Sequence, residues 1–238
     1  MTAPTRTATA RERARAELTR EIKEEARRQL VAAGADGLSL RAVARELGMV
    51  SSALYRYYPS RDDLLTALII DAYDAIGEVT ERAIAAAPAG RPRGRWAAAC
   101  HAIRDWARAH PHEYALIYGS PVPGYQAPQA TIAPAARVPV ALVGMLAQAA
   151  ADGALAPASP SALPLDGALA AQAAALTALL DLTALPPDAL VGAVIAWTQL
   201  FGLLSFELFG QLVGSFEPAD ALFACAVERM ADLAGLPR

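Results

Sequence analysis

The sequence predicts an all-α protein with a small N-terminal helical domain and a larger C-terminal one. Three observations support this fold class. Hydrophobic residues make up 55% of the 238 residues, which is enough for a buried core. Alanine is abundant and β-branched and aromatic residues are modest in number, which favours helices over sheets. Apolar residues recur at helical spacing. The sequence contains no internal repeat and no long run of alternating apolar and polar residues of the kind that predicts a strand.

Charge is divided unevenly along the chain. Residues 1–65 hold 12 of the 21 Lys and Arg but only 9 of the 24 Asp and Glu, a net charge of +3. The remaining residues then carry a net charge of -6, and the whole chain carries -3. A basic N-terminal third on an acidic body is the arrangement expected if only that third contacts phosphate.

The first elements follow from apolar spacing and from capping residues. Residues 1–14 are polar and irregular, which predicts a mobile arm. An amphipathic pattern predicts a helix over 15–33, and Gly34 ends it. A short helix over 40–47 follows, with Ser39 as its N-cap.

A third short helix is predicted over 51–57, because Pro59 stops it. Ser60 and Asp63 form a capping box that opens a long helix over 60–87. Beyond a break at 88–94 the periodicity predicts helices over 95–110, 112–119, 134–152, 166–185, 188–213 and 218–234, separated by long loops at 120–134 and 154–164.

The segment LSLRAVARELGMVSSALYRYYPSRDDLL, residues 38–65, has the pattern of a helix-turn-helix, with its turn at Gly48. We expect its apolar side chains to pack inward and fix the crossing of the two helices; these are Leu40, Val43, Ala44, Leu47, Val50 and Leu54. The second helix then presents Ser51, Ser52, Tyr55 and Arg56 outward. These hydrogen-bonding groups suit a DNA groove.

This segment resembles the tetracycline-repressor-like (TetR) family of regulators. The matching positions are Ser39, Val43-Ala44, Gly48, Leu54-Tyr55, Tyr57-Tyr58, Ser60-Arg61 and Leu64-Leu65, in the family's order and at its distance from the N-terminus. The resemblance implies an N-terminal three-helix DNA-binding domain, residues 15–60, and a helical effector-binding and dimerisation domain, residues 61–238.

The resemblance also implies roles for single residues. Ser39, Tyr55, Tyr57 and Arg61 are expected to contact phosphate, and Arg41, Ser51, Ser52 and Arg56 to read base edges. Tyr58 is assigned to the core. The arginines of the arm, Arg6, Arg11, Arg13 and Arg15, either reach phosphate and the minor groove or form a solvated tail.

The last two helices, 188–213 and 218–234, are apolar on more than one face, so they must be buried on several sides. Two such helices from each of two protomers would form an isologous four-helix bundle, so we expect a homodimer. The C-terminal half is also similar to a subgroup of the family with a Trp, His and Gly signature on the penultimate helix. Trp197 and Gly202 match that signature, but Phe201 stands where histidine is expected.

The resemblance implies an effector cavity in the C-terminal domain. Candidate lining residues are Trp106, Tyr114, Tyr118, Gln172, Trp197, Phe201 and Glu207, which together suit a small, mainly apolar molecule. Aromatic residues at helical spacing are more often core residues than ligand contacts, and Gln172 is also compatible with the surface. A buried Glu207 carboxylate needs a partner, which is a ligand amine, the partner protomer or water.

The function implied is that of a ligand-responsive repressor that binds a palindromic operator as a homodimer and is released by its effector. The helix over 60–87 is the expected coupling element, since it starts at the DNA and ends in the effector domain. A repressor without a ligand, an architectural DNA-binding protein and an activator are the alternatives within DNA binding.

An enzyme is the main alternative outside DNA binding. His101, His110 and His112 lie close in sequence, and Asp105 falls on the same helix face as His101. No Cys- or Glu-rich motif accompanies them, and Cys100 and Cys225 have no partner at metal-ligand spacing. We therefore expect neither catalysis, nor a metal, nor a cofactor, and we expect reduced thiols in the cytoplasm.

The apolar stretch 189–213 is long enough to span a membrane. It contains Gln199, Glu207 and Gln211 and lacks flanking basic residues. We therefore interpret it as a core or interface helix and expect no membrane partner.

Overall fold

The computed structural model describes residues 9–156 and 165–238. All regular structure in these residues is helical, which confirms the predicted class: ten α-helices and two short 3-10 helices. They are α1 (Ala10–Ala33), η1 (Ala35–Gly37), α2 (Leu40–Glu46), α3 (Ser51–Leu54), α4 (Arg61–Ala86), α5 (Pro92–Ala109), α6 (Pro111–Tyr118), η2 (Gln129–Thr131), α7 (Ile132–Ala151), α8 (Gly167–Leu179), α9 (Pro187–Leu208) and α10 (Asp220–Leu233).

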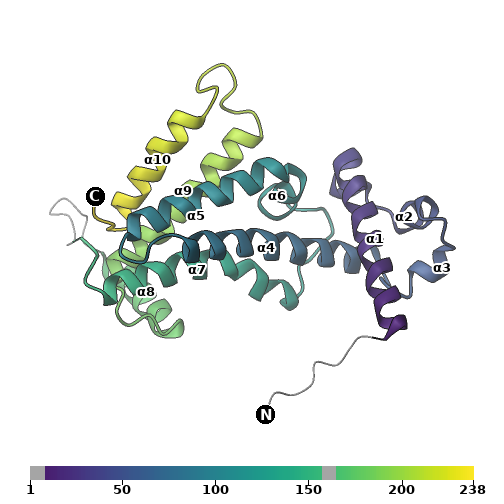
Figure 1. Cartoon of the computed structure of the whole chain (residues 1–238), viewed down its shortest axis with the longest axis horizontal. Coiled ribbons are helices and arrows are strands. Elements are labelled where there is room, and N and C mark those ends of the chain that lie inside the picture. The colour runs from purple at the N-terminus through teal and green to yellow at the C-terminus, as the bar shows by residue number, and fades with distance from the viewer. Residues whose placement is uncertain (1–8, 157–164) are drawn as a thin grey trace, which may run out of the picture.

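The helices form two parts joined by α4. Figure 1 shows α1, α2 and α3 as a small group at one end, and α4 running from that group into the larger body formed by α5 to α10. Within the body α4 packs along α5 and α7. Most of the expected loop at 154–164 lies outside the described residues.

The first helix begins earlier than the sequence suggested. Helix α1 starts at Ala10 rather than near residue 15, so the end of the expected arm is helical. The reason is a capping box: the Glu12 N–H donates to the Thr9 hydroxyl at 3.2 Å, and the Thr9 N–H donates to the Glu12 carboxylate at 2.7 Å. These bonds satisfy backbone donors that a helix start otherwise leaves free.

Three other helices end sooner than predicted. Helix α8, expected over 166–185, stops at Leu179. Helix α3 stops at Leu54, which places Tyr57 in the following turn. Helix α9 stops at Leu208 rather than at 213, since Gly210 and Gly214 adopt φ angles of 82° and 76°. Glycine is favoured in this left-handed region, so these positions turn the chain out of the helix.

Two hydrophobic cores lie at the two ends of α4. The small core combines residues of α1, α2, α3 and the first turns of α4, among them Ile22, Val43, Leu54 and Leu65. The large core combines residues of α4 to α10. Leu68 and Ile69 belong to the small core and Ala72 and Ile76 to the large one, so α4 passes from one core to the other within about one turn.

Helices α9 and α10 approach each other closely at Gly192. A Cβ atom at this position would lie 2.1 Å from the Leu233 carbonyl oxygen. The α9–α10 packing therefore depends on the absence of a side chain there.

We expect Gly192→Ala to lower the free energy of unfolding by roughly 1–3 kcal/mol, because α10 must move away from α9. Gly144→Ala on α7 is the matched control: a Cβ there has no atom within 4 Å, so it should gain about 0.5–1 kcal/mol of helix propensity. Urea unfolding measures both variants. Equal effects of the two substitutions would contradict the close approach.

Candidate DNA interface and effector site

The helix-turn-helix core positions an exposed polar face. Val43, Ala44 and Leu54 are completely buried, and they fix α2 against α3. As a result Ser52, Tyr55 and Arg56 are exposed and Ser51 is half-buried. Arg41 is exposed on α2. The structure thus brings the four predicted residues of α3 and its following turn to one end of the small domain.

Val50 is a correction to the predicted core. Its side chain is 70% exposed, although we expected it to pack inward. Val50 is the N-cap of α3 and has extended backbone angles (φ -70°, ψ 137°), which turn its side chain away from the core. Its place immediately before α3 is the signal that sequence reasoning missed.

Three of the four residues predicted to contact phosphate, Ser39, Tyr57 and Arg61, interact with neighbours within the protein. The Ser39 hydroxyl caps α2 by accepting from the Ala42 N–H at 3.4 Å. Tyr57 is half-buried, and the Arg15 guanidinium lies over its ring at 5.4 Å. Arg61 donates to the Ala35 carbonyl at 2.7 Å. Tyr58 is buried in the core, as expected.

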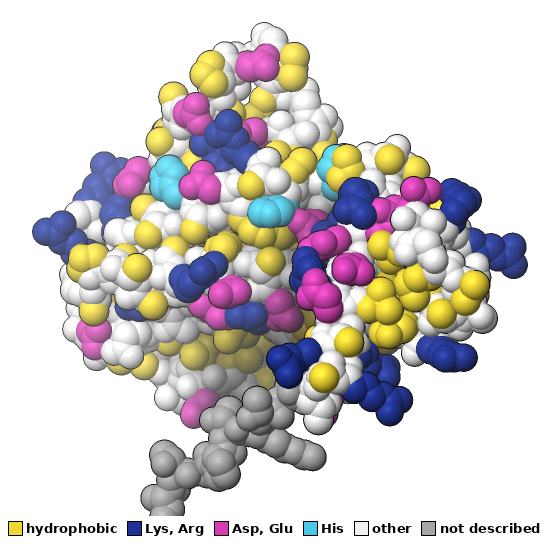
Figure 2. Space-filling model, turned by 45° about the vertical axis from the view of Figure 1, so that its right-hand side comes forward, with side chains coloured by type: hydrophobic (Ala, Val, Ile, Leu, Met, Phe, Trp, Pro, Cys, Tyr) yellow, Lys and Arg dark blue, Asp and Glu magenta, His cyan; other side chains and the backbone are white. Residues whose placement is uncertain are grey.

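Figure 2 shows Lys and Arg side chains around the margin of the small domain, and Asp and Glu side chains gathered where it meets the body. The ion pairs at this junction link three helices. Arg27 of α1 donates to Asp71 of α4 at 2.7 Å and to Glu113 of α6 at 2.9 Å. Lys23 donates to the same Asp71 at 2.8 Å. The charged groups thus tie α1 directly to α6 as well as to α4.

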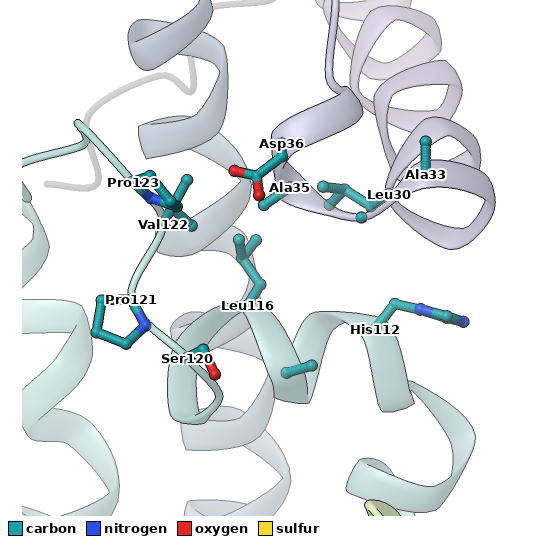
Figure 3. A pocket seen from close by; sticks show the side chains of 12 residues that line it. Leu30, Ala33, Ala35, Asp36, His112, Leu116, Ser120, Pro121, Val122 and Pro123 are labelled. Atoms are coloured by element: carbon teal, nitrogen blue, oxygen red, sulfur yellow. The ribbon is translucent and has the colours of Figure 1, made fainter.

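A cavity of about 230 Å³ lies between the small domain and the body. Its walls come from the end of α1, from η1, from α6 and from residues 120–123. In Figure 3 Leu116 projects from α6 toward Ala35 and Leu30. Leu116 and Val122 also pack on the small core, so the body closes one side of that core.

Six aromatic side chains form a cluster in the body, which we call the aromatic cluster. They come from α4, α6, α9 and the residue that follows α9: Tyr73, Tyr114, Tyr118, Trp197, Phe201 and Phe209. The Tyr118 and Phe201 ring centroids are 4.1 Å apart, and the Trp197 and Phe201 centroids 6.1 Å. The cluster therefore brings together four of the seven residues expected at the effector site.

Tyr114 fixes α6 to α9 within this cluster. Its hydroxyl donates to the Phe201 carbonyl at 2.9 Å and lies 3.0 Å from the Ser205 hydroxyl. Burial raises the pKa of Tyr114 to about 12, so its hydroxyl stays protonated at neutral pH.

Two family models match the chain. Residues 22–68 match the model described as "Bacterial regulatory proteins, tetR family", and residues 96–230 match "Tetracyclin repressor-like, C-terminal domain". The chain belongs to the TetR family. The chain is thus a transcriptional regulator that binds DNA through a helix-turn-helix, and not an enzyme.

Known relatives agree with this assignment. The HTH-type transcriptional regulators Rv1816 of Mycobacterium tuberculosis and Mb1846 of Mycobacterium bovis are each 39% identical over 201 residues, which cover 83% of this chain and 83% of theirs. A crystal structure named for a regulatory protein, SCO4313, is 36% identical, with a TM-score of 0.76 over 94% of this chain and 100% of that one.

The remaining effector candidates of this TetR-family chain are not members of the aromatic cluster. Trp106 is buried in the large core, and its ring stacks on the His110 ring with 5.3 Å between the ring centroids. Gln172 is exposed on α8. The expectation that Glu207 awaits a ligand, a second protomer or water is wrong, because Arg104 of the same chain binds both of its oxygens at 2.7 and 2.9 Å.

The histidines of this TetR-family chain have separate surroundings. His101 packs edge-on against Phe223, and His110 stacks on Trp106. In the described part of the chain no three His, Cys, Asp or Glu side chains are grouped to hold a metal ion. The alternative of a catalytic histidine cluster is set aside by the family assignment.

In the part of the chain that the structure describes, two helices are long and apolar enough to cross a membrane by length and composition alone: Gln129–Ala151 and Pro187–Leu208. In this fold the second of them, α9, packs against α7, α8 and α10 and contributes Leu200 and Leu204 to the large core.

Proposed function

We propose that the protein is a homodimeric repressor in the cytoplasm that binds a palindromic operator and leaves it when a small, mainly apolar effector enters the aromatic cluster. Residues 15–60 bind DNA in this proposal, and residues 61–238 bind the effector and the partner protomer. The start of α4 completes the core of the DNA-binding domain.

The observation that carries the ligand response is that α6 belongs to two sites. Its Tyr114 and Tyr118 lie in the aromatic cluster, while Glu113 binds Arg27 of the DNA-binding domain. A ligand that shifts α6 must therefore strain or break an ion pair with α1. The α6–α1 contact is therefore a second path of coupling between the effector site and the DNA-binding domain, in addition to the path that we expected along α4.

Release from the operator requires a coupling free energy of the usual size for an allosteric protein. Lowering operator affinity 100-fold takes about 2.7 kcal/mol of differential effector binding between the two states. A palindromic operator tolerates only a narrow spacing of the two recognition helices, so a small rotation of each DNA-binding domain is enough.

On DNA, four side chains contact base edges: Ser51, Ser52, Arg56 and Arg41. Four others contact phosphate: Ser39, Tyr55, Tyr57 and Arg61. The exposed Val50 adds an apolar group at the start of α3, suited to a thymine methyl group. Arg15, which lies over the Tyr57 ring, brings a cation of α1 to the same phosphate site.

Dimerisation uses the faces of α9 and α10 that the body leaves uncovered. On α9 exposed residues recur every three or four positions, at Ile195, Gln199, Gly202 and Phe206. Two such faces related by a two-fold axis give the isologous bundle of four helices. The two-fold axis then sets the distance between the two DNA-binding domains.

The experiment is binding of purified protein to DNA from upstream of its own gene and, in parallel, to sites selected from random DNA, across a salt series. We expect one dimer per palindrome and an affinity that falls with salt. Arg56→Ala should weaken specific binding roughly 5- to 150-fold through loss of a base contact.

Arg82→Ala is the matched control, since Arg82 is an exposed arginine on α4 away from α3. It should leave the affinity for the palindrome nearly unchanged. If the selection yields no palindrome, or if both variants lose affinity equally, the proposed reading of DNA by α3 is wrong.

A further inference from the structure

The aromatic cluster contains a buried hydrogen-bond donor that the protein does not use. The indole N–H of Trp197 is enclosed by protein atoms and has no acceptor; it is the only buried side-chain nitrogen or oxygen in this state among residues 9–156 and 165–238. Trp96 shows the usual situation, because its indole N–H donates to the Val227 carbonyl at 3.2 Å. An unsatisfied buried donor is costly, so a partner for it is expected.

A second donor, the Tyr118 hydroxyl, belongs to a ring that also contacts Phe201. The Tyr118 ring contacts the Phe201 ring, yet its hydroxyl makes no hydrogen bond to any residue that the structure describes. Tyr114, one turn earlier on α6, has its hydroxyl bound to Phe201 and Ser205. Burial raises the pKa of Tyr118, so its hydroxyl keeps its proton and remains a donor at neutral pH.

The one charged residue of α9 between Phe201 and Phe209 is already neutralised. Glu207, further along α9, is bound on both oxygens by Arg104. An ammonium ligand would have to compete with this guanidinium, and among the described residues no Lys or Arg lies over a ring of the cluster, where it could pair with a carboxylate ligand. The surroundings therefore favour a neutral ligand.

We propose that the aromatic cluster binds a neutral, mainly aromatic molecule that carries a hydrogen-bond acceptor such as a carbonyl oxygen, and that Trp197 and Tyr118 donate to it. This inference rests on the proposed effector site. Because the Tyr118 and Phe201 rings touch, the ligand enters by separating α6 from α9. That movement displaces Glu113 from Arg27, so binding is read out in the DNA-binding domain.

Three probes of the same shape test the chemistry: benzophenone, which has a carbonyl acceptor; diphenylmethane, which has none; and benzhydrylamine, a cation at neutral pH. Dissociation constants are measured by titration with the full chain. We expect benzophenone to bind roughly tenfold more tightly than diphenylmethane, as one or two neutral hydrogen bonds allow. Benzhydrylamine should bind least tightly.

Tyr118→Phe keeps the ring and Trp197→Phe puts a smaller aromatic ring in place of the indole; both remove the donor, so together they should bring the ratio of the two neutral probes to about one. Trp96→Phe is the matched control, because it removes an indole N–H that lies outside the aromatic cluster and already donates to the Val227 carbonyl. It should lower the melting temperature and leave the ratio unchanged.

Three results would overturn the proposal: equal binding of the two neutral probes to the unmodified protein, a preference that survives in the double variant, or no benzophenone binding up to its solubility limit. Operator binding by the same preparations separates this failure from failure of the proposed function. Intact operator binding with no probe preference removes only the ligand chemistry; absent operator binding removes the repressor proposal.

Discussion

Arg104→Met is expected to lower the free energy of unfolding by about 3 kcal/mol, the lower end of the range for breaking a buried ion pair. The Arg104 side chain is 7% exposed and the Glu207 side chain 14%, so neither charge is well screened by solvent. Arg104 also donates to Asp220 at 2.8 Å, and its guanidinium lies over the Phe223 ring at 4.5 Å. One residue of α5 thus joins α9 to α10.

The loss comes mainly from leaving Glu207 buried without its partner. Arg108, whose guanidinium is 3.9 Å from Glu207, offers partial compensation, which is why the lower end of the range is expected. The measurement is urea unfolding followed by circular dichroism.

Two controls identify the cause. Arg108→Met removes an arginine that is 54% exposed, so it should cost less than about 1 kcal/mol. Arg104→Met combined with Glu207→Leu removes both charges and should recover much of the stability. If the double variant is as unstable as Arg104→Met alone, packing by the arginine, and not charge pairing, holds α5 to α9.

Phe206→Glu is expected to convert the dimer to a monomer and to weaken operator binding roughly 10³-fold at nanomolar protein, the scale that separates specific from non-specific binding. Phe206 is 54% exposed on the uncovered face of α9. In the proposed dimer a carboxylate there meets its own copy across the two-fold axis in an apolar interface, where neither charge has a partner.

Sedimentation velocity measures the mass, and anisotropy of labelled DNA measures the affinity. Val140→Glu on α7 is the matched control, since Val140 is 49% exposed and lies outside the α9–α10 face. It should leave both quantities unchanged. A Phe206→Glu variant that remains dimeric would move the interface away from this face of α9.

The sequence determined the helical class and the helix-turn-helix, because both depend on local information. Apolar spacing, the Ser39 and Ser60 caps and the glycine after α2 act within a few residues of each other, so they can be recognised without knowing the fold. The family pattern over 38–65 rests on the same short-range order. Helix ends were predicted less accurately. The capping box of Thr9 and Glu12 starts α1 among polar residues that have no apolar spacing to mark the helix.

The tertiary structure alone decided which side chains meet. Arg104 and Glu207 are 103 positions apart, Arg27 and Glu113 are 86 apart, and Tyr118 reaches Phe201 from another helix. The sequence named Glu207 as a buried acid in need of a partner, but helical periodicity gives only the face of a residue and not the helix that packs on it. Contacts between distant helices depend on crossing angles and close approaches, such as that at Gly192, which are set only when the whole core packs.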